Sequence, residues 1–240
     1  MWFGELWPVL AQGVNDTRRT FGVEDATSWT DIFARHARAY SVVPASFDEQ
    51  RDEPTANLVH VGWTVPGAPA EKLTKGRPVV LLSLSTTAMG DRELIQATLD
   101  GLGALNVRGI ATIVDRVGHR DLRVPGNVTV RDMVPHASLL PDVDVVVTHA
   151  GLGTVAAALS HGVPLVCTPI ERDQPLNAEL IERCGAGLVV EHPTAPNIVV
   201  AVQRVLDNRE FRAAAERLRG NDGARNTADD LEGLVGSRGA

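Results

Sequence analysis

From Pro78 onward, short continuous apolar runs alternate with segments of helical period, and this alternation constrains the fold more than any other feature. Strands that read as continuous apolar runs are buried on both faces, as in parallel sheets covered by helices on both sides. The sequence therefore predicts an α/β domain with a Rossmann-like parallel sheet. The expected elements are strand 79–84, helix 91–102, strands 108–114, 127–130 and 143–148, helix 154–161, strand 165–168, helix 174–184, strand 187–190 and helix 211–218.

The first 66 residues differ from the rest, because they contain too little apolar material for an independent domain. We expect a helix over 29–40 with Ser28 as its N-cap, and two short extended segments at 41–43 and 58–61. A stretch rich in proline and glycine predicts a linker. The expected division is a domain remnant at 1–66, a linker at 67–77, the α/β domain at 78–219 and a polar tail with a frayed end at 220–240.

Composition excludes several classes of function. The net charge of −7 and the aromatic content of 4% argue against a nucleic-acid binder, which would show a basic stripe or stacking aromatics. No apolar run exceeds about five residues, far short of the roughly 20 that a membrane span needs. The start carries Glu5 and no basic region, unlike a secretory signal, so we expect a cytoplasmic protein. Two cysteines, Cys167 and Cys184, are expected to be free thiols.

A strand, a glycine-containing loop and a helix follow one another at 143–161, VDVVVTHAGLGTVAAALSH. Gly151 and Gly153 permit positive φ angles and let a ligand approach the backbone closely. The start of the following helix offers N–H groups and a partial positive charge, which suit a phosphate group. Thr154 can cap this helix or donate its hydroxyl to phosphate, and His149 can donate a ring N–H. The loop predicts a phosphate site, with a plain strand–turn–helix junction as the alternative.

The next strand leads into TPIERDQPLNA at 168–178, which places Asp173 and Gln174 at the carboxyl edge of the sheet. Open α/β sheets bind ligands at this edge. A carboxylate accepts hydroxyl protons and a carboxamide both donates and accepts, so the pair suits a polyol. Asp173 alone would more simply be a helix N-cap. Its closeness to the glycine loop favours a sugar-binding pair.

Together these segments closely resemble the nucleotide-sugar signature of GT-B glycosyltransferases, in the group of UDP-glycosyltransferases and bacterial natural-product glycosyltransferases. Residues 80–87 and 127–141 resemble the first strand and the base-binding loop of that family's C-terminal domain, and 15–23 and 41–62 resemble the end of its N-terminal domain. The resemblance covers nearly the whole chain. It implies a reaction in which a hydroxyl of a small-molecule acceptor attacks the anomeric carbon of a nucleoside-diphosphate sugar.

The resemblance also implies roles for individual residues, without any metal or other cofactor, because the helix dipole and side chains stabilise the leaving diphosphate. The positions that hold the diphosphate match His149, Gly151, Gly153, Thr154 and, more weakly, Ser85. The loop that packs on the nucleobase and reads its edge through the backbone matches Met133, Val134 and His136. The pair that holds the sugar hydroxyls matches Asp173 and Gln174.

Two positions depart from the family pattern. A Glu that grips the ribose in many relatives is Ala157 here, and the base-stacking aromatic is Met133 or Arg131. The nucleotide is therefore open between UDP and dTDP, and a deoxysugar donor fits as well.

The acceptor pocket and the His general base of inverting family members lie in an N-terminal domain that the resemblance places ahead of this chain. His36 falls in an expected helix and His60 in a strand, so no catalytic residue is assigned. We expect the chain alone to bind a donor without transferring its sugar. An uncovered apolar face near residues 2–7 would favour self-association or a separate N-terminal domain partner.

Two other functions stay open on the sequence alone. The stretch GLGTVA also fits a dinucleotide fingerprint, with Glu171 20 residues after Gly151, as in an NAD-dependent dehydrogenase. Against it, that fingerprint opens the first βαβ unit, whereas this loop comes late in the sheet. The other alternative is a catalytically inactive donor-binding or regulatory subunit. Asp142 and Asp144 mimic a metal-binding pair, but at the start of a buried strand we expect a structural role.

Overall fold

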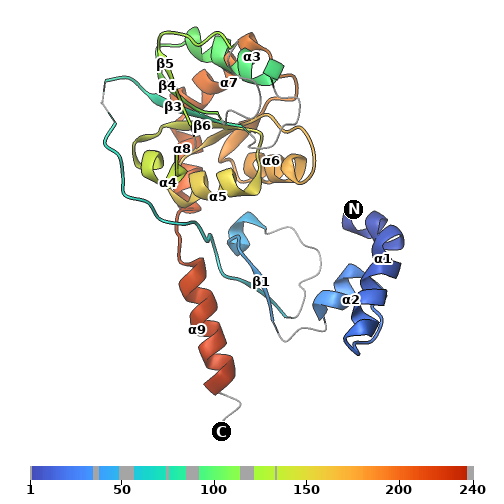
Figure 1. Ribbon diagram of the computed structural model, residues 1–240. Coiled ribbons are helices and arrows are strands. Elements are labelled where there is room, and N and C mark those ends of the chain that lie inside the picture. Colours follow the sequence, from blue (N-terminus) through green and yellow to red (C-terminus); the bar gives the residue numbers. More distant parts are fainter. Residues whose placement is uncertain are drawn as a thin grey trace.

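The main body of the computed structural model is a six-stranded parallel sheet with helices on both faces (Figure 1). The strand order is β5-β4-β3-β6-β7-β8, which confirms the predicted α/β class. The strands are β3 (Val79–Ser83), β4 (Arg108–Thr112), β5 (Val128–Arg131), β6 (Val145–Thr148), β7 (Leu165–Cys167) and β8 (Gly187–Val189). The structure describes residues 2–34, 38–48, 57–73, 76–84, 92–113, 122–132 and 134–236.

Side chains alternate along each strand between two apolar cores. In β3, Val79 and Leu81 belong to one cluster, whereas Val80 and Leu82 belong to the other, and all four are buried. One core lies under α3 and α7, and the other lies under α4, α5, α6 and part of α8. This double burial explains why the strands read as continuous apolar runs. The helices are α3 (Arg92–Gly103), α4 (His136–Leu139), α5 (Leu152–Ser160), α6 (Gln174–Arg183), α7 (Ala195–Asp207) and α8 (Arg209–Arg217).

Helix α7 is an element that the sequence analysis did not predict. Its N-cap Thr194 accepts a hydrogen bond from the Asn197 amide, and a proline stands in its first turn. Its apolar residues Ile198, Val202 and Val205 recur at helical spacing and are buried against the sheet. A start signal and a helical period were therefore both present in the sequence.

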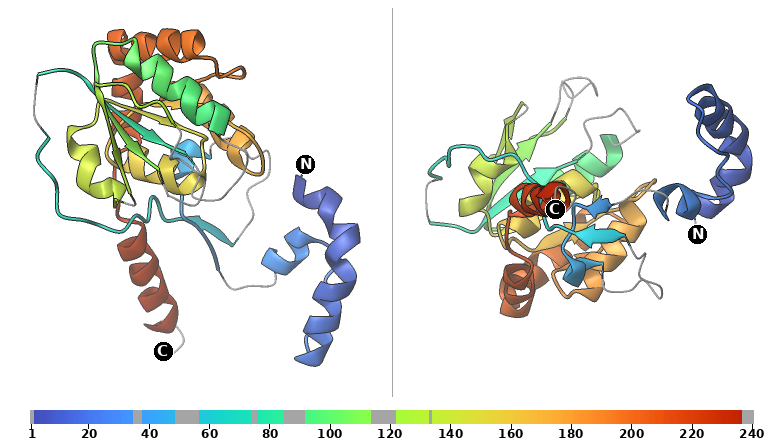
Figure 2. Two further views of the ribbon diagram at one scale, coloured as in Figure 1. Left: turned by 45° about the horizontal axis from the view of Figure 1, so that its top comes forward. Right: turned by 90° about the horizontal axis from the view of Figure 1, so that it is seen from below.

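The N-terminal part forms a helical hairpin followed by a separate two-stranded parallel sheet (Figure 2). Its elements are α1 (Trp2–Thr20), α2 (Trp29–Ala34), β1 (Ala39–Ser41) and β2 (Leu58–His60). The hydroxyl of Ser28 accepts a hydrogen bond from the Asp31 amide, as expected of an N-cap. The predicted helix over 29–40 was too long, because α2 ends at Ala34 and Tyr40 lies in β1, paired with Val59.

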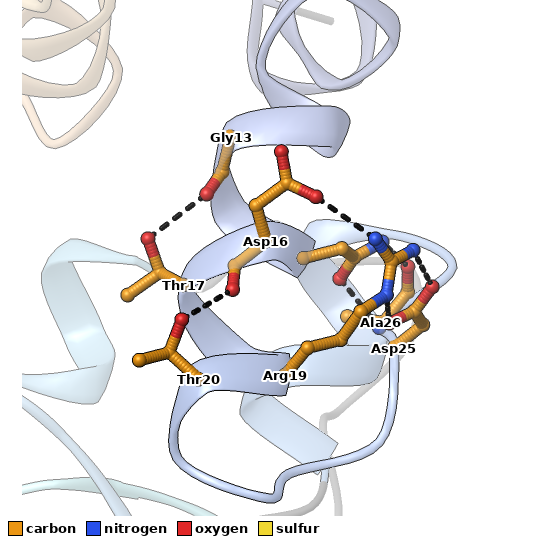
Figure 3. A network of polar contacts seen from close by, with 8 residues as sticks. Gly13, Asp16, Thr17, Arg19, Thr20, Asp25 and Ala26 are labelled. Atoms are coloured by element: carbon orange, nitrogen blue, oxygen red, sulfur yellow. Dashed lines mark hydrogen bonds and ion pairs between the residues drawn. The ribbon is translucent and has the colours of Figure 1, made fainter.

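Local polar contacts hold α1 to the segment that follows it (Figure 3). The side chain of Asn15 donates to the Ala26 carbonyl and accepts from the Ala26 amide, at 3.0 and 2.8 Å. Arg19 forms ion pairs with Asp16 and Asp25. Nearer the start of α1, the ring of Trp7 meets that of Trp29 in α2 edge to face, with their centroids 5.2 Å apart. None of the described helices is long and apolar enough to cross a membrane.

Residues 223–236 of the expected polar tail form helix α9 (Gly223–Gly236), which was not predicted from the sequence, and the end of the tail lies outside the described residues. At Gly223 a Cβ atom would lie 2.3 Å from the Thr64 hydroxyl oxygen, so only glycine allows these two segments of the chain to approach this closely. Farther along the helix, the Asp230 carboxylate accepts hydrogen bonds from Tyr40 and Arg38. The last described helix is therefore attached to the N-terminal sheet.

Two segments far apart in the sequence, 61–65 and 218–226, run side by side, and we call them the crossing. The Trp63 indole donates to the Leu218 carbonyl at 2.8 Å, and the Asn221 side chain bonds both the amide and the carbonyl of Val65. The Asn226 side chain donates to the Val61 carbonyl at 2.7 Å. These bonds fasten the N-terminal part to the main body.

Candidate functional site

The carboxyl ends of β3 and β6 form the topological switch point of the sheet. From β3 the chain proceeds to β4 and β5 on one side, and from β6 it proceeds to β7 and β8 on the other. Ser83 and Thr148 are partners in the register at this point, and both are buried. Ligands of open α/β sheets bind in the crevice outside such a point. The loop that follows β6 therefore lies where a ligand is expected.

This loop differs in its backbone from the prediction. Helix α5 begins at Leu152 with Gly151 as its N-cap, so Thr154 lies in the first turn and does not cap the helix. Gly151 has a φ of −62°, and the residue with positive φ is Ala150, at 64°. Amides of the first helical turn have no partner within the helix. Those of Leu152 and Gly153 therefore form the positive end of α5 at the switch point.

The two glycines of the loop serve different purposes. A Cβ atom on Gly151 would lie 2.5 Å from Nε2 of His149, so this glycine makes room for the imidazole ring. A Cβ atom on Gly153 would meet nothing within 4 Å, and the residue is exposed. The structure thus brings His149 and an open helix N-terminus together, as the phosphate-site interpretation requires.

A hydroxyl–imidazole cluster lies beneath the loop. The hydroxyl of Ser83 is 3.1 Å from Nε2 of His136 and 3.4 Å from the hydroxyl of Thr154. Burial lowers the pKa of His136, which favours the neutral ring with one donor and one acceptor nitrogen. Ser83 was missed in the sequence, although a hydroxyl that ends a buried strand at this edge was a usable signal.

The remaining residues assigned to the nucleobase and diphosphate are only partly described. Val134 is half-buried and packs on the core beneath α4 and α5, while Met133 and Ser85 lie outside the described residues. Arg131, the other candidate for stacking on the base, forms a two-pronged ion pair with Glu71, at 2.6 and 2.8 Å. Its guanidinium is therefore bound to the segment expected to be the linker.

The predicted pair Asp173 and Gln174 is placed at the carboxyl edge, but its two members face different ways. Asp173 is exposed and occupies the N-cap position of α6 without a side-chain capping bond. Gln174 is buried, and its carboxamide oxygen accepts from the amides of Ile170 and Glu171, at 2.8 and 3.1 Å. Asp173 therefore presents its carboxylate outward, whereas Gln174 holds the β7–α6 loop.

Asn177, which the sequence analysis did not name, joins the two loops. Its side-chain amide donates to the Ala150 carbonyl at 3.0 Å and to the Asp173 carboxylate at 2.9 Å. The spacing of four residues between Asp173 and Asn177 was a signal, because such residues share one face of a helix.

The two residues that mimic a metal-binding pair make structural contacts. Asp142 accepts from the Leu73 amide at 3.0 Å, and Asp144 accepts from the Val79 amide at 2.7 Å. The described residues contain no group of three or more His, Cys, Asp or Glu that could hold a metal ion. Cys167 and Cys184 form no disulfide, as expected, and burial raises the pKa of Cys167.

The strand order bears on the dehydrogenase alternative. In a sheet of this order the dinucleotide fingerprint follows the first strand, which is β3 here. The GLGTVA stretch instead follows β6, the fourth strand of this sheet along the chain. His36, one residue considered as a general base, lies outside the described residues. His60, the other, lies in β2 with Nδ1 3.2 Å from the Val43 carbonyl oxygen.

Comparisons with known proteins show a family for this chain. Residues 96–233 match the family described as "Erythromycin biosynthesis protein CIII-like, C-terminal domain". The chain is 34% identical over 204 residues to 4'-demethylrebeccamycin synthase of Lentzea aerocolonigenes, a match that covers 79% of this chain and 48% of that protein. The chain thus spans about half the length of this curated relative.

Two solved structures show the same fold. The glycotransferase of kitacinnamycin has a TM-score of 0.77 and 22% identity, over 94% of this chain and 62% of that one. The glycosyltransferase VinC in complex with DTDP has a TM-score of 0.69 and 24% identity, over 88% of this chain and 53% of that one.

Proposed function

Because this chain belongs to the family of erythromycin biosynthesis protein CIII-like C-terminal domains, we propose that it is the donor-binding part of a GT-B glycosyltransferase. The complete enzyme would transfer a sugar from a nucleoside-diphosphate sugar to a hydroxyl of a small-molecule acceptor. The observation that carries the proposal is the loop 149–154 at the switch point, with Asp173 on the adjacent loop.

The diphosphate is proposed to lie against the N-terminus of α5. The first-turn amides of Leu152 and Gly153, the Thr154 hydroxyl and the His149 ring would donate to its oxygens. When the bond to the sugar breaks, negative charge grows on the diphosphate, and preorganised donors of this kind stabilise it most at that moment. We propose that these groups supply the electrostatic stabilisation without a metal ion.

The other two parts of the donor follow from the position of the diphosphate. We propose that the nucleobase packs against Met133 and Val134, and that the loop ending at His136 reads its edge through the backbone. The sugar hydroxyls would bind the exposed carboxylate of Asp173 and the amide nitrogen of Gln174, whose oxygen is already used. The VinC structure contains DTDP, which supports dTDP or the closely related UDP as the nucleotide.

The acceptor side of the reaction is a further part of the proposal. The match covers 48% of the rebeccamycin enzyme's length, so the acceptor pocket and the general base are assigned to sequence beyond this match. We propose that an N-terminal α/β half supplies both, in the same polypeptide or as a separate partner.

Calorimetry with UDP, dTDP, the corresponding monophosphates and NAD tests the proposal. The diphosphates are expected to bind best and NAD poorly. His149→Ala should weaken UDP or dTDP by about 1–3 kcal/mol, the scale of a hydrogen bond to a charged group. His161→Ala at the opposite end of α5 is the matched control and should change neither affinity.

Two outcomes would contradict the proposal. Tight binding of NAD without binding of UDP or dTDP would favour a dehydrogenase. If His149→Ala weakened the binding of the monophosphates as much as that of the diphosphates, His149 would not contact the second phosphate.

A further inference from the structure

The geometry points to Asn177 as a positioning residue that fixes the sugar-binding carboxylate of Asp173 relative to the phosphate-binding loop. This inference rests on the proposed function, because it concerns the same donor site. Asn177 itself is buried, with 6% of its surface exposed. It acts through two hydrogen bonds, one to each loop.

Both hydrogen bonds come from the same amide group. Nδ2 of Asn177 donates one hydrogen to the Ala150 carbonyl at 3.0 Å and the other to Oδ2 of Asp173 at 2.9 Å. A carboxamide nitrogen has two hydrogens, so both are used. The distances are those of good hydrogen bonds, and the acceptors belong to loops that follow different strands. One rigid planar group therefore sets the separation of the two loops.

At Ala150 this bond holds a backbone that is otherwise unfavourable. Ala150 has a φ of 64°, in a region that residues with a side chain seldom adopt. Such conformations persist when the surroundings fix them. Ala150 is fully buried, its amide bonds the Thr148 hydroxyl at 3.3 Å, and its carbonyl bonds Asn177. The backbone conformation of Ala150, and with it the orientation of the neighbouring residues His149 and Gly151, thus depends on Asn177.

At Asp173 the bond selects one orientation of an exposed side chain. Within the described part of the chain, Oδ2 accepts from Asn177, and Oδ1 accepts no hydrogen bond. An exposed aspartate without such a contact would sample several rotamers. With Oδ2 held, Oδ1 remains to accept from a ligand hydroxyl. Asn177 would thereby lower the entropy lost when the sugar binds.

The same helix supports the neighbouring loop in a similar way. Arg172 also has a positive φ, 62°, and the loop on which it lies is bonded by the Gln174 carboxamide. Gln174 and Asn177 are one turn apart on α6. Helix α6 thus supplies two buried carboxamides to the two loops that carry the proposed ligand contacts.

A double-mutant cycle with Asp173 tests the inference. For wild type, N177A, D173A and the double variant, calorimetry measures the affinities of UDP and UDP-glucose, and of dTDP and dTDP-glucose. N177A should lower nucleotide-sugar affinity roughly tenfold more than nucleoside-diphosphate affinity, as D173A should. In the double variant, the ratio of nucleotide-sugar affinity to nucleoside-diphosphate affinity should be no more than about twofold lower than in D173A. The reason is that both single variants remove the same interaction. Asn197→Ala, at an exposed asparagine on α7, is the control and should leave the affinities for all four ligands unchanged.

The isosteric N177D variant gives a second readout, the pH dependence of ligand selectivity, which a purely structural role of Asn177 would not change. Its carboxyl group can donate to Ala150 or Asp173 only when protonated, and when two carboxyl groups lie close together the pKa of one of them is raised. Its selectivity for nucleotide sugar over nucleoside diphosphate should therefore rise as the pH falls from 7.5 to 5.5, while that of N177A should not. The pH dependence of N177D, compared with that of wild type, provides this readout even if N177A folds poorly.

The outcomes separate the two proposals. If wild type binds neither nucleoside diphosphate nor nucleotide sugar, the proposed function fails, and this inference fails with it. If wild type binds both and N177A keeps the wild-type selectivity, only the role of Asn177 is overturned. Independent, multiplicative losses in the double variant would also overturn it.

Discussion

Replacing Gly153 by alanine should stabilise the fold and weaken donor binding at the same time. The added Cβ would meet no atom within 4 Å, and the residue lies in the first turn of α5 without a positive φ. Alanine is favoured over glycine in a helix by about 0.5–1 kcal/mol. For a chain of this size that corresponds to a rise of about 1–4 °C in Tm.

Binding should change in the opposite direction, because the methyl group would occupy the space through which a phosphate reaches the amides of α5. Loss of one hydrogen bond to a charged group is worth about 1.5–3 kcal/mol, or roughly 10- to 100-fold in the Kd of UDP or dTDP. Thermal unfolding and calorimetry on the same sample measure both changes.

Gly13→Ala is the matched control, because Gly13 also lies in a helix with open space around its Cβ position. It should raise Tm without changing the Kd. Gly151→Ala should instead displace the His149 ring and lower affinity by a different route. A Gly153→Ala variant with higher Tm and unchanged Kd would refute the placement of the diphosphate at this helix end.

Two other predictions concern half-buried polar groups. Burial lowers the pKa of His136 in the folded protein, so its contribution to stability is complete above the ordinary histidine pKa of about 6.5 and is lost as the pH falls through the lowered folded value. Urea unfolding between pH 7.5 and 5 should show a smaller loss of stability on acidification in His136→Asn than in wild type, and equal slopes would contradict this. Asp142→Ala should lower the free energy of unfolding by about 1–3 kcal/mol through the lost bond to the Leu73 amide, with no change in the Kd of UDP. A large change in that Kd would contradict the structural role.

The sheet could be predicted because its signal is local and repeated. Residues such as Val146 and Val147 are adjacent in sequence and buried on opposite faces, which produces the continuous apolar runs. Their order along the chain also placed the glycine loop late in the sheet. The sequence therefore indicated which loops lie at the carboxyl edge of the sheet, where the candidate site is proposed.

What the sequence could not provide depends on contacts between distant segments. The positive φ lies at Ala150 and not at a neighbouring glycine, because a buried bond from Asn177 helps to hold it. The composition of 220–240 is that of a tail, yet Asp230 and Gly223 pack against residues of the N-terminal part. Gln174 was identified by residue type, but its inward orientation depends on the amides of a loop whose shape the sequence does not specify.

The crossing gives the molecule a particular mechanical property. The chain leaves the small β1–β2 sheet through 61–65 and returns towards it through 218–226, and hydrogen bonds join these two segments. Because two adjacent, hydrogen-bonded segments connect the N-terminal part to the main body, they permit bending about one axis and resist twisting and separation of the two parts. Any opening of this molecule between its sheets should therefore be a single-axis rotation about the line of the crossing, with Trp63 and Asn221 close to the pivot.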